Sequence, residues 1–449
     1  MHTDLIRKHA APVPRYTSYP TAPHFHGGVN VATYREWLGK IAPGTALSLY
    51  IHIPYCDRLC WFCACNTRQT RRYEPIAQYL HYLYREIATV ARLVADGVEV
   101  GALHFGGGSP TMLSPDDMRT LNDVLRGAFK FRPDAEISVE IDPNDMDEAR
   151  FDALAEIGMT RVSLGVQDFD PRVQAAINRE QSFAQTKAVV DAARARGAQS
   201  VNLDLLYGLP HQTVDSVAAT VEQALSLDPD RIALFGYAHV PWMRKHQTMI
   251  DEATLPDIVG RFEQSSRAAQ IIAGHGYQVI GIDHFAKPGD AMAVAHREGR
   301  LRRNFQGYTV DDLDTLIGFG ASSIGKLGQG YVQNSTATGE YERLVSENGL
   351  AVTKGFALSE EDRMRAWVIE RLMCDFSFSK AEFTDCFGIT GAPLAALADR
   401  LVAEDEDGLV ITDGDRFVVT ERGRPVVRAV VAAFDAYLGS NGARHSAAV

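Results

Sequence analysis

The sequence lacks long apolar runs, and it has too little positive charge for several classes of protein. No stretch of about 18 consecutive apolar residues occurs, so we expect no membrane-spanning helix and no membrane partner. The N-terminus shows no apolar run followed by a small-residue cleavage site, so we expect no secretion signal and a cytoplasmic location. Lysine and arginine number 45 against 57 acidic residues, a net charge of −12. Because an acidic chain repels phosphates, we expect no nucleic-acid partner.

Cysteine is scarce, and its distribution argues against a disulfide scaffold. Two of the six cysteines, Cys374 and Cys386, are isolated. The others lie within ten residues of one another: Cys56, Cys60, Cys63 and Cys65. Thiols this close cannot all pair without strain, and a scaffold in a chain of 449 residues would spread them. Clustered thiols without a secretion signal indicate a metal or an iron–sulfur cluster in a reducing compartment.

The middle of the chain alternates strand-like and helix-like segments. Apolar residues make up 46% of the sequence, which supports a large core. Six segments are rich in β-forming residues: 46–54, 98–108, 136–143, 161–169, 200–210 and 231–240. A helical pattern follows each of them. Strands that alternate with helices predict a parallel sheet with right-handed crossovers, either an open doubly wound sheet or an incomplete barrel.

Composition divides the chain into three parts. Residues 1–45, rich in Pro, Tyr, Thr and His, predict an irregular N-terminal arm with one helix near 33–42. Residues 46–350 carry the strand–helix units of a catalytic domain. Residues 351–449 predict a small helical domain with a β-wing, because 409–420 forms a hairpin pattern around Asp413-Gly414. Its helix patterns cover 358–374, 391–408 and 422–439, and residues 440–449 are expected to be a disordered tail.

The cysteine cluster follows the first predicted strand. The spacing C-x3-C-x2-C, from Cys56 to Cys63, places three thiolates in one loop at the ligand-binding edge of an α/β sheet. Three thiolates on four irons would leave one iron open. The alternative is a four-cysteine zinc site, but structural zinc usually draws its cysteines from two separate loops. The pattern therefore favours an iron–sulfur cluster.

Several motifs together resemble a known family. The cysteine spacing after a first strand is similar to that of radical S-adenosylmethionine enzymes. The surrounding segments resemble oxygen-independent coproporphyrinogen III oxidases (coproporphyrinogen dehydrogenases) of haem biosynthesis: PRYTSYPTAPHF, YIHIPYCDRLCWFCACN, FGGGSPT, EISVEIDP, SLGVQDF, VNLDLLYGLPHQT, YAHVPW, GIDHFA and RRNFQGYT. The resemblance implies an α/β fold, an incomplete barrel of about six units extended by further strands, with a smaller helical C-terminal domain.

The resemblance also implies a cluster and a first S-adenosylmethionine. Cys56, Cys60 and Cys63 would hold a [4Fe–4S] cluster, whose open iron would bind the amino and carboxylate groups of S-adenosylmethionine. Further residues would lie at this cofactor: Tyr50, Gly106, Gly107, Gly108, Glu140 and, through its backbone, Ile324. Tyr50 and His52 alternate with apolar residues and so share one face of the first strand, although the role of His52 stays open. Cys65 is either catalytic or a spare buried thiol.

A second S-adenosylmethionine is the other implied ligand. The matching positions are Phe62, Gly108, Ser109, Gln167, Arg179, Asp204 and Ala238. Arg179 would pair with the cofactor carboxylate and Asp204 with its amino group. Ser109 departs from the threonine common in the family but keeps the hydroxyl. Considered individually, each of these positions also has an ordinary structural explanation, as the polar end of a strand.

The activity implied is the oxygen-independent oxidation of coproporphyrinogen III. A 5′-deoxyadenosyl radical would take a hydrogen atom from each of two propionates, and loss of carbon dioxide and an electron would leave vinyl groups, giving protoporphyrinogen IX. This requires a low-potential electron donor and an electron acceptor, both unidentified, and we expect a monomer. A haem-carrying or haem-degrading paralogue is the nearer alternative, but the fourth cysteine and the PRYTSYPT arm argue against it. A non-enzymatic iron–sulfur or zinc protein is the other.

One basic segment, residues 296–309, stands out on this acidic chain. It carries Arg297, Arg300, Arg302 and Arg303. Such a cluster is usually a solvated face, and it lacks the interleaved aromatic residues of a nucleic-acid patch. A tetracarboxylate substrate would need cations, and Arg15 in the arm is another candidate.

Overall fold

The barrel begins with β1 (Ala46–Ile53), in which apolar side chains alternate with polar ones. The computed structural model describes residues 3–10 and 12–439. Leu47, Leu49 and Ile51 are fully buried against the outer helices. Because side chains alternate between the two faces of a strand, Tyr50 and His52 point into the barrel. The predicted shared face of these two residues is therefore present.

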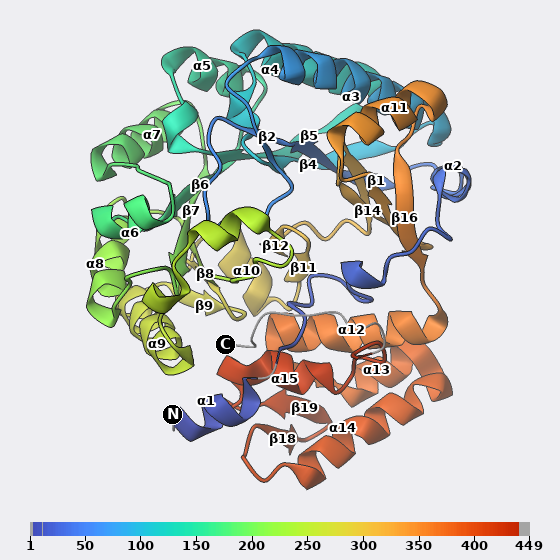
Figure 1. The fold of residues 1–449 in the computed structure, drawn as a ribbon. Coiled ribbons are helices and arrows are strands. Elements are labelled where there is room, and N and C mark those ends of the chain that lie inside the picture. The colour runs from blue at the N-terminus through green and yellow to red at the C-terminus, as the bar shows by residue number, and fades with distance from the viewer. Residues whose placement is uncertain (1–2, 11, 440–449) are drawn as a thin grey trace.

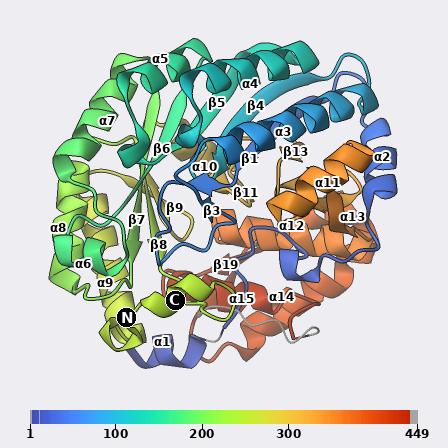
Figure 2. The same cartoon turned by 45° about the horizontal axis from the view of Figure 1, so that its top comes forward.

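Six parallel strands form the wall of the barrel in the predicted order (Figures 1 and 2). The neighbours along the sheet are β1, β4 (Glu99–Gly107), β5 (Lys130–Ile141), β6 (Arg161–Gln167), β7 (Ser200–Tyr207) and β8 (Arg231–Gly236). Helices cover the outside of this wall: α3 (Glu74–Leu93), α4 (Pro115–Ala128), α5 (Glu148–Glu156), α6 (Pro171–Ala176), α7 (Phe183–Ala195), α8 (Val214–Leu225) and α9 (Ile258–Gly274). The predicted strand–helix alternation is confirmed.

Additional strands extend both edges of the sheet. On one side, β1 pairs in parallel with β13 (Thr315–Phe319), and antiparallel strands follow: β14 (Ile324–Leu327), β15 (Gly330–Asn334) and β16 (Val352–Ala357). On the other side lie β10 (His284–Ala286) and β9 (Gln278–Ile280). Across residues 12–439 the order of the 12 strands runs from β16 to β9 without returning to its start. The incomplete barrel is therefore confirmed, and the open sheet is not.

A hairpin and the C-terminal part lie along the open side of the barrel. The hairpin consists of β11 (Arg302–Asn304) and β12 (Gly307–Thr309), and Figure 1 shows it between the sheet and the C-terminal helices. The C-terminal elements are α12 (Glu360–Asp375), β17 (Ser377–Ser379), α13 (Lys380–Phe387), α14 (Ala392–Glu404), β18 (Val410–Asp413), β19 (Arg416–Val419) and α15 (Val427–Ala432). Two further helices connect strands: α10 (Ala291–Arg297) lies between β10 and β11, and α11 (Thr338–Asn348) lies between β15 and β16 and packs against α3.

The structure refines three details of the C-terminal prediction. The hairpin of β18 and β19 is present, but β17 joins it as a third strand. The last helix is shorter than the pattern over 422–439 indicates. The barrel sheet continues through β16, past residue 350. The expected tail, 440–449, lies outside the described residues.

The N-terminal arm packs against the C-terminal part. It contains α1 (Thr3–His9), which the sequence pattern does not predict, and α2 (Val31–Gly39). Leu5, Ile6, Tyr16 and Tyr19 belong to the same apolar core as α12 and α15. The arm therefore joins the two ends of the chain along the open side of the barrel.

One helical stretch, Lys380–Glu404, is long and apolar enough to cross a membrane by length and composition alone. It comprises α13, the 3₁₀ turn Gly388–Gly391 and α14, and Gly388 has a φ of 61°. The stretch meets this criterion because its mean hydropathy is high, although polar residues interrupt it. A search for uninterrupted apolar runs therefore does not find it. The expected absence of a membrane partner stays a prediction.

Candidate active site

The cysteine loop connects two short parallel strands, β2 (Tyr55–Cys56) and β3 (Arg68–Gln69), directly after β1. Its backbone is held from two sides. The backbone N–H of Trp61 donates to the Ile177 carbonyl at 2.9 Å, and the Asn178 side-chain amide donates to the Leu59 carbonyl at 3.0 Å. These contacts fix the loop over the carboxyl ends of the barrel strands.

A second segment, residues 244–247, holds the opposite side of the loop. The Arg244 guanidinium donates to the Ala64 carbonyl at 2.8 Å, and the His246 ring to the Cys63 carbonyl at 2.7 Å. The Gln247 amide donates to the carbonyls of both Phe62 (2.9 Å) and Ala238 (3.2 Å). Phe62 and Ala238, predicted to share a ligand, are thus brought together.

The thiols of the loop have different surroundings. Arg179 Nη1 lies 3.6 Å from Cys60 Sγ, and Thr67 Oγ1 lies 3.1 Å from Cys56 Sγ. The thiol and the backbone N–H of the exposed Cys65 both hydrogen-bond to Cys63, and they lower the pKa of the Cys63 thiol to about 7. Burial raises the pKa of the Cys56 and Cys60 thiols, although Thr67 and Arg179 act in the opposite direction, so Cys63 is the thiol of the three that ionises most readily.

The cysteine thiols fit an iron–sulfur cluster better than a single metal ion. Within residues 3–10 and 12–439, no group of three or more His, Cys, Asp or Glu side chains is arranged to hold one metal ion. The thiolates of a multi-iron cluster bind different irons, so they lie farther apart than the ligands of one ion. Three thiols on one loop beside the Arg179 cation match that arrangement.

The glycines that end β4 are required by protein neighbours. A Cβ on Gly106 would lie 2.8 Å from Glu140 Oε1, and one on Gly107, where φ is 116°, would lie 2.8 Å from the His52 ring. A Cβ on Gly108 would lie 2.6 Å from the Tyr55 carbonyl. Glu140, His52 and the cysteine loop therefore approach these backbone positions closely, and the place of the glycines at a cofactor stays a prediction.

Glu140 lies at the centre of a hydrogen-bonded network on the inner face. Its Oε2 accepts from the Gly107 N–H, and its Oε1 lies 3.1 Å from His104 Nε2. Burial raises the pKa of this carboxyl, but the hydrogen bonds from His104 and Gly107 outweigh burial and hold it below its ordinary value. Glu140 is therefore an anion at neutral pH and can accept hydroxyl donors.

Tyr50 and His52 complete this network. The Tyr50 ring stacks on His104 with ring centroids 5.7 Å apart. His52 Nε2 donates to the Asn66 carbonyl at 2.9 Å, so its Nδ1 accepts from the Tyr50 hydroxyl at 3.1 Å. Burial lowers the pKa of His52, so the ring is neutral at pH 7. The Ile324 carbonyl lies against Gly318, which pairs with Tyr50 across the sheet.

A second group of side chains combines residues on or just after β5, β6 and β7 with Arg179, which lies between α6 and α7. Arg179 is buried and donates to Asp142 Oδ2 at 2.9 Å and to the Gly165 carbonyl at 2.6 Å. Its Nε is buried without a hydrogen-bond partner among the described residues. Gln167 has a φ of 69°, an uncommon conformation for a residue with a side chain and one that concentrates at functional sites.

Asp204 faces this group from β7. Its oxygens accept from Ser163 Oγ at 3.0 Å and from Asn202 Nδ2 at 2.7 Å. Burial and the Glu140 charge raise the pKa of Asp204 to about 6. Ser109 is buried and donates to Asp145 Oδ2 at 2.6 Å, and burial raises the pKa of Asp145 to about 6.

Four polar residues of this region do not appear among the sequence-based candidates. They are His104, Asp142, Asp145 and Asn202. Asp142 and Asp145 follow Glu140 directly at the end of β5, and His104 pairs with Tyr50 across the sheet. The two acids follow a predicted strand, and this position could have marked them as candidates from the sequence. That His104 lies beside Tyr50 could be known only from the register between β1 and β4.

The basic segment divides into two kinds of arginine. Arg297, Arg300 and Arg302 have acceptors nearby on Gln278, Glu298 and Glu370 respectively. Arg303 instead turns inward, and its guanidinium lies over the Tyr308 ring, 4.4 Å from the centroid. The prediction of a solvated face describes Arg297 and Arg300 but not Arg303.

Comparison with known families gives two matches. Residues 50–224 match the radical SAM superfamily, and residues 358–426 match the HemN C-terminal domain. The second match begins just after β16, which agrees with the point at which the barrel sheet ends.

Similar curated proteins match this chain over nearly its whole length. The oxygen-independent coproporphyrinogen III oxidase of Paracoccus denitrificans is 48% identical over 98% of this chain and 97% of its own length. That of Bradyrhizobium diazoefficiens is also 48% identical, over 97% of each. The solved structure of coproporphyrinogen III oxidase (HemN) from Escherichia coli, described as a radical SAM enzyme, superimposes with a TM-score of 0.91 at 39% identity, covering 97% of this chain and 99% of that one. The chain therefore belongs to the oxygen-independent coproporphyrinogen III oxidase family of radical SAM enzymes.

Proposed function

We propose that this protein converts coproporphyrinogen III to protoporphyrinogen IX without oxygen, as a step of haem biosynthesis. One observation carries the proposal. In a chain that matches these oxidases over nearly its whole length, a three-thiol loop, the Glu140 network and the Arg179–Asp204 group converge at the carboxyl ends of one parallel sheet. Ligands of α/β sheets bind at that edge.

Cys56, Cys60 and Cys63 are the proposed ligands of the [4Fe–4S] cluster. When bound, the cluster and S-adenosylmethionine supply a 5′-deoxyadenosyl radical that removes a hydrogen atom from the substrate. Each reacting propionate then loses carbon dioxide and passes one electron to an acceptor. The protein residues position the reactants and exclude water.

Two sets of residues are proposed to hold S-adenosylmethionine. Glu140, kept ionised by its donors, accepts the ribose hydroxyls of the first molecule, with Tyr50, Gly107 and the Ile324 backbone beside it. The second set is Phe62, Gly108, Ser109, Gln167, Arg179, Asp204 and Ala238. In this set Arg179 supplies the cation for a carboxylate and Asp204 the anion for an amino group.

Arg179 links the second set to the cysteine loop through its own contacts. It already pairs with Asp142 and lies against Cys60, so it stabilises the thiolate and presents its remaining Nε to a ligand. His52 positions the Tyr50 hydroxyl by accepting its hydrogen bond. Cys65, exposed beside the ligand loop, is the proposed thiol that acts at the substrate.

Further features of the proposal concern partners and organisation. The reaction needs a low-potential electron donor and an acceptor, which the chain does not identify, and we retain a monomer and a cytoplasmic reaction. Clustered thiols require a reducing compartment, which supports that location. The proposed division is an arm up to residue 45, a catalytic domain through β16, and a C-terminal domain from residue 358.

An anaerobic assay tests the function directly. The reconstituted protein is mixed with coproporphyrinogen III, S-adenosylmethionine, a strong reductant and an artificial acceptor. We expect protoporphyrinogen IX together with 5′-deoxyadenosine and methionine. Cofactor cleavage without porphyrin turnover, combined with tight haemin binding, would instead identify a haem-carrying relative.

A further inference from the structure

Four arginines from distant parts of the sequence meet at the open side of the barrel. They are Arg15 in the arm, Arg261 on α9, Arg303 on β11 and Arg428 on α15. We call them the arginine cluster. None belongs to the cofactor motifs, and the catalytic scheme above leaves all four without a role.

Hydrogen bonds place three of these arginines together. Arg15 Nη2 donates to the Gly236 carbonyl at 3.0 Å, and Arg261 Nη2 donates to the Tyr237 carbonyl at 2.8 Å. Both guanidinium groups therefore lie at the carboxyl end of β8. Arg303 Nη2 contacts the Arg15 carbonyl at 3.4 Å, which brings the β11–β12 hairpin to the same place.

Arg428 lies close enough to Arg15 and Arg303 to interact with both electrostatically. Burial and the neighbouring charges of Arg15 and Arg303 lower the pKa of Arg428 to about 10. Burial and the Arg15 charge also lower the pKa of Arg261. The exposed Arg15 thus faces the more buried guanidinium groups of Arg261 and Arg428, and Arg428 in turn faces Arg303.

The carboxylate identified among these cations is Asp283, which has other partners as well. Its Oδ1 lies 2.7 Å from the His284 ring. Burial raises the pKa of Asp283, but His284, Arg303 and Arg15 outweigh burial and lower it. Because Asp283 is also bonded to a histidine, it is a weak counter-ion for the two guanidinium groups that face it, those of Arg303 and Arg15.

Arg303 gives a second, independent sign of a missing anion. Its Nε and Nη1 are buried and have no hydrogen-bond partner among the described residues. Its sequence neighbour Arg302, in contrast, pairs with Glu370. A buried charged donor without an acceptor is costly, so these N–H groups require an acceptor from outside the described residues, a ligand or a water molecule.

The arginine cluster lies within reach of the cofactor residues. The Arg261 guanidinium lies 5.8 Å from the centroid of the Tyr207 ring, at the end of β7. Tyr207 follows Asp204 by three residues, which corresponds to roughly 10 Å along a strand. A tetrapyrrole macrocycle with its propionate arms spans such a distance.

We propose that the arginine cluster binds carboxylates of the substrate, namely the two propionates that are retained in the product. This inference rests on the proposed function, because it names the contacts of that substrate. Guanidinium groups bind carboxylates through two parallel hydrogen bonds, and Arg303 has two buried N–H groups to offer. The unreactive side of the macrocycle is then held by the arm, the hairpin and α15, while the reacting side faces the cofactors.

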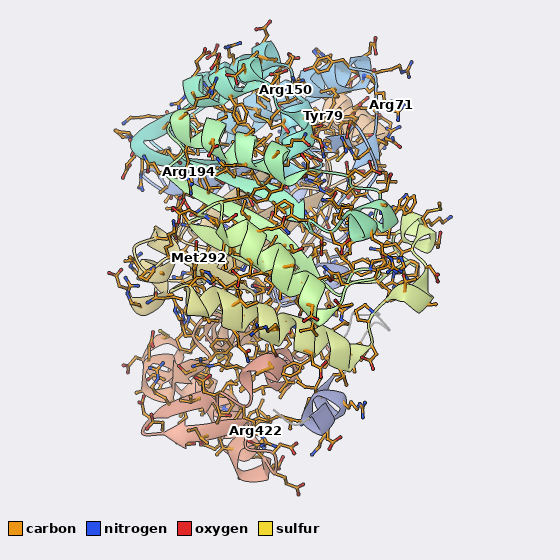
Figure 3. The ribbon with its side chains drawn as sticks, turned by 90° about the vertical axis from the view of Figure 1, so that its left-hand side faces the viewer. Arg71, Tyr79, Arg150, Arg194, Met292 and Arg422 are labelled. Carbon is orange, nitrogen blue, oxygen red and sulfur yellow. The ribbon has the colours of Figure 1, made fainter. Side chains whose placement is uncertain are left out.

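The test measures porphyrin binding separately from catalysis. Coproporphyrin III, the fluorescent oxidised form of the substrate, and its tetramethyl ester are titrated into the full-length reconstituted protein. Arg303→Gln and Arg428→Gln remove one cation each from two separate elements. Arg422→Gln is the matched control, because Arg422 is exposed on the C-terminal part, near the lower edge of Figure 3.

We expect each cluster variant to bind coproporphyrin III at least about tenfold more weakly, with less than about twofold change for the ester. The control should match the wild type. Melting temperatures are recorded for every variant, and Arg303→Lys, which keeps the charge but loses the paired N–H groups, replaces Arg303→Gln if that variant does not fold.

Two results would overturn the inference: unchanged affinity for coproporphyrin III in both variants, or an equal loss for acid and ester, which would mark a packing defect. The proposed function has its own readout, which is product formation by the wild type. A wild type without turnover contradicts that function whatever the variants bind.

Discussion

The two sides of the active site differ in charge and in how the chain builds them. The side on β5 and β7 is acidic, with Glu140, Asp142, Asp145 and Asp204 at or after strand ends. The opposite side is the arginine cluster, assembled from the arm, α9, β11 and α15. The acidic side belongs to one sheet, whereas the basic side exists only when four distant segments pack together.

The acidic side carries the proposed cofactor contacts, and the basic side carries the proposed substrate contacts. A parallel sheet places successive strand ends side by side, so the acidic side follows from strand order alone. The basic side depends on how the arm and the C-terminal part dock. A substitution on one side should therefore leave ligand binding on the other side unchanged. Substitutions on each side test this independence, and we take them from the largest expected effect to the smallest.

Cys60→Ala should have the largest effect. Cys60 is buried and lies next to Arg179, and its loss removes one of the three proposed cluster ligands. We expect loss of the cluster absorbance and of all S-adenosylmethionine cleavage, while coproporphyrin III binding is unchanged. Iron analysis and fluorescence titration on one preparation check this, with the exposed Cys386→Ala as control. About four irons retained in Cys60→Ala would refute the assignment.

Glu140→Gln should weaken the acidic side without dismantling it. The amide loses the charge that accepts from Gly107 and faces His104. We expect KM for S-adenosylmethionine to rise about 30-fold, equivalent to about 2 kcal/mol, with iron content unchanged. Asp134→Asn, an exposed change on the same strand, is the control. A KM within twofold of the wild type would remove Glu140 from the cofactor site.

Cys65→Ser separates the fourth thiol from the ligand set. Cys65 contacts Cys63 but lies outside the C-x3-C-x2-C spacing. We expect full iron content and a loss of at least about tenfold in protoporphyrinogen yield. A spare exposed thiol would instead change stability by no more than about 0.5 kcal/mol and leave turnover intact. Iron content and product yield from one anaerobic preparation distinguish the two.

The pH dependence of cofactor binding should follow Asp204. Burial raises its pKa to about 6, so its negative charge is present above pH 6 and is lost as the pH falls through that value. Between pH 7 and pH 5 the ionised fraction drops from roughly nine-tenths to roughly one-tenth, so we expect about tenfold weaker S-adenosylmethionine binding. Equilibrium dialysis measures it. Asp204→Asn should bind weakly with little pH dependence, and a wild type that behaves likewise would exclude this role.

The smallest expected effect concerns nucleic acid. Arg303 of the basic segment turns inward onto the Tyr308 ring, and the chain carries a net charge of −12. We therefore expect no gel shift with duplex DNA or RNA at physiological salt. Tight, salt-sensitive binding would show that the basic segment serves a surface function instead.

The sequence was most informative where structure is local. The buried alternation of Leu47, Leu49 and Ile51 predicts β1, and cysteine spacing predicts the ligand loop. Strand order and the helical C-terminal part were predictable for the same reason. The short α1 and β17 carry too few residues for a periodic signal. The arginine cluster joins residues more than 200 positions apart, which no pattern in one sequence encodes.

The anchoring of the cysteine loop bears on how the cofactor is installed. Hydrogen bonds from Asn178, Arg244, His246 and Gln247 hold the loop backbone from both sides. The polypeptide itself thus determines the shape of the loop. In a zinc finger, by contrast, the free energy of metal binding drives folding. We therefore expect the loop to keep its backbone path before iron and sulfide bind, so that a cluster can assemble on an already folded chain.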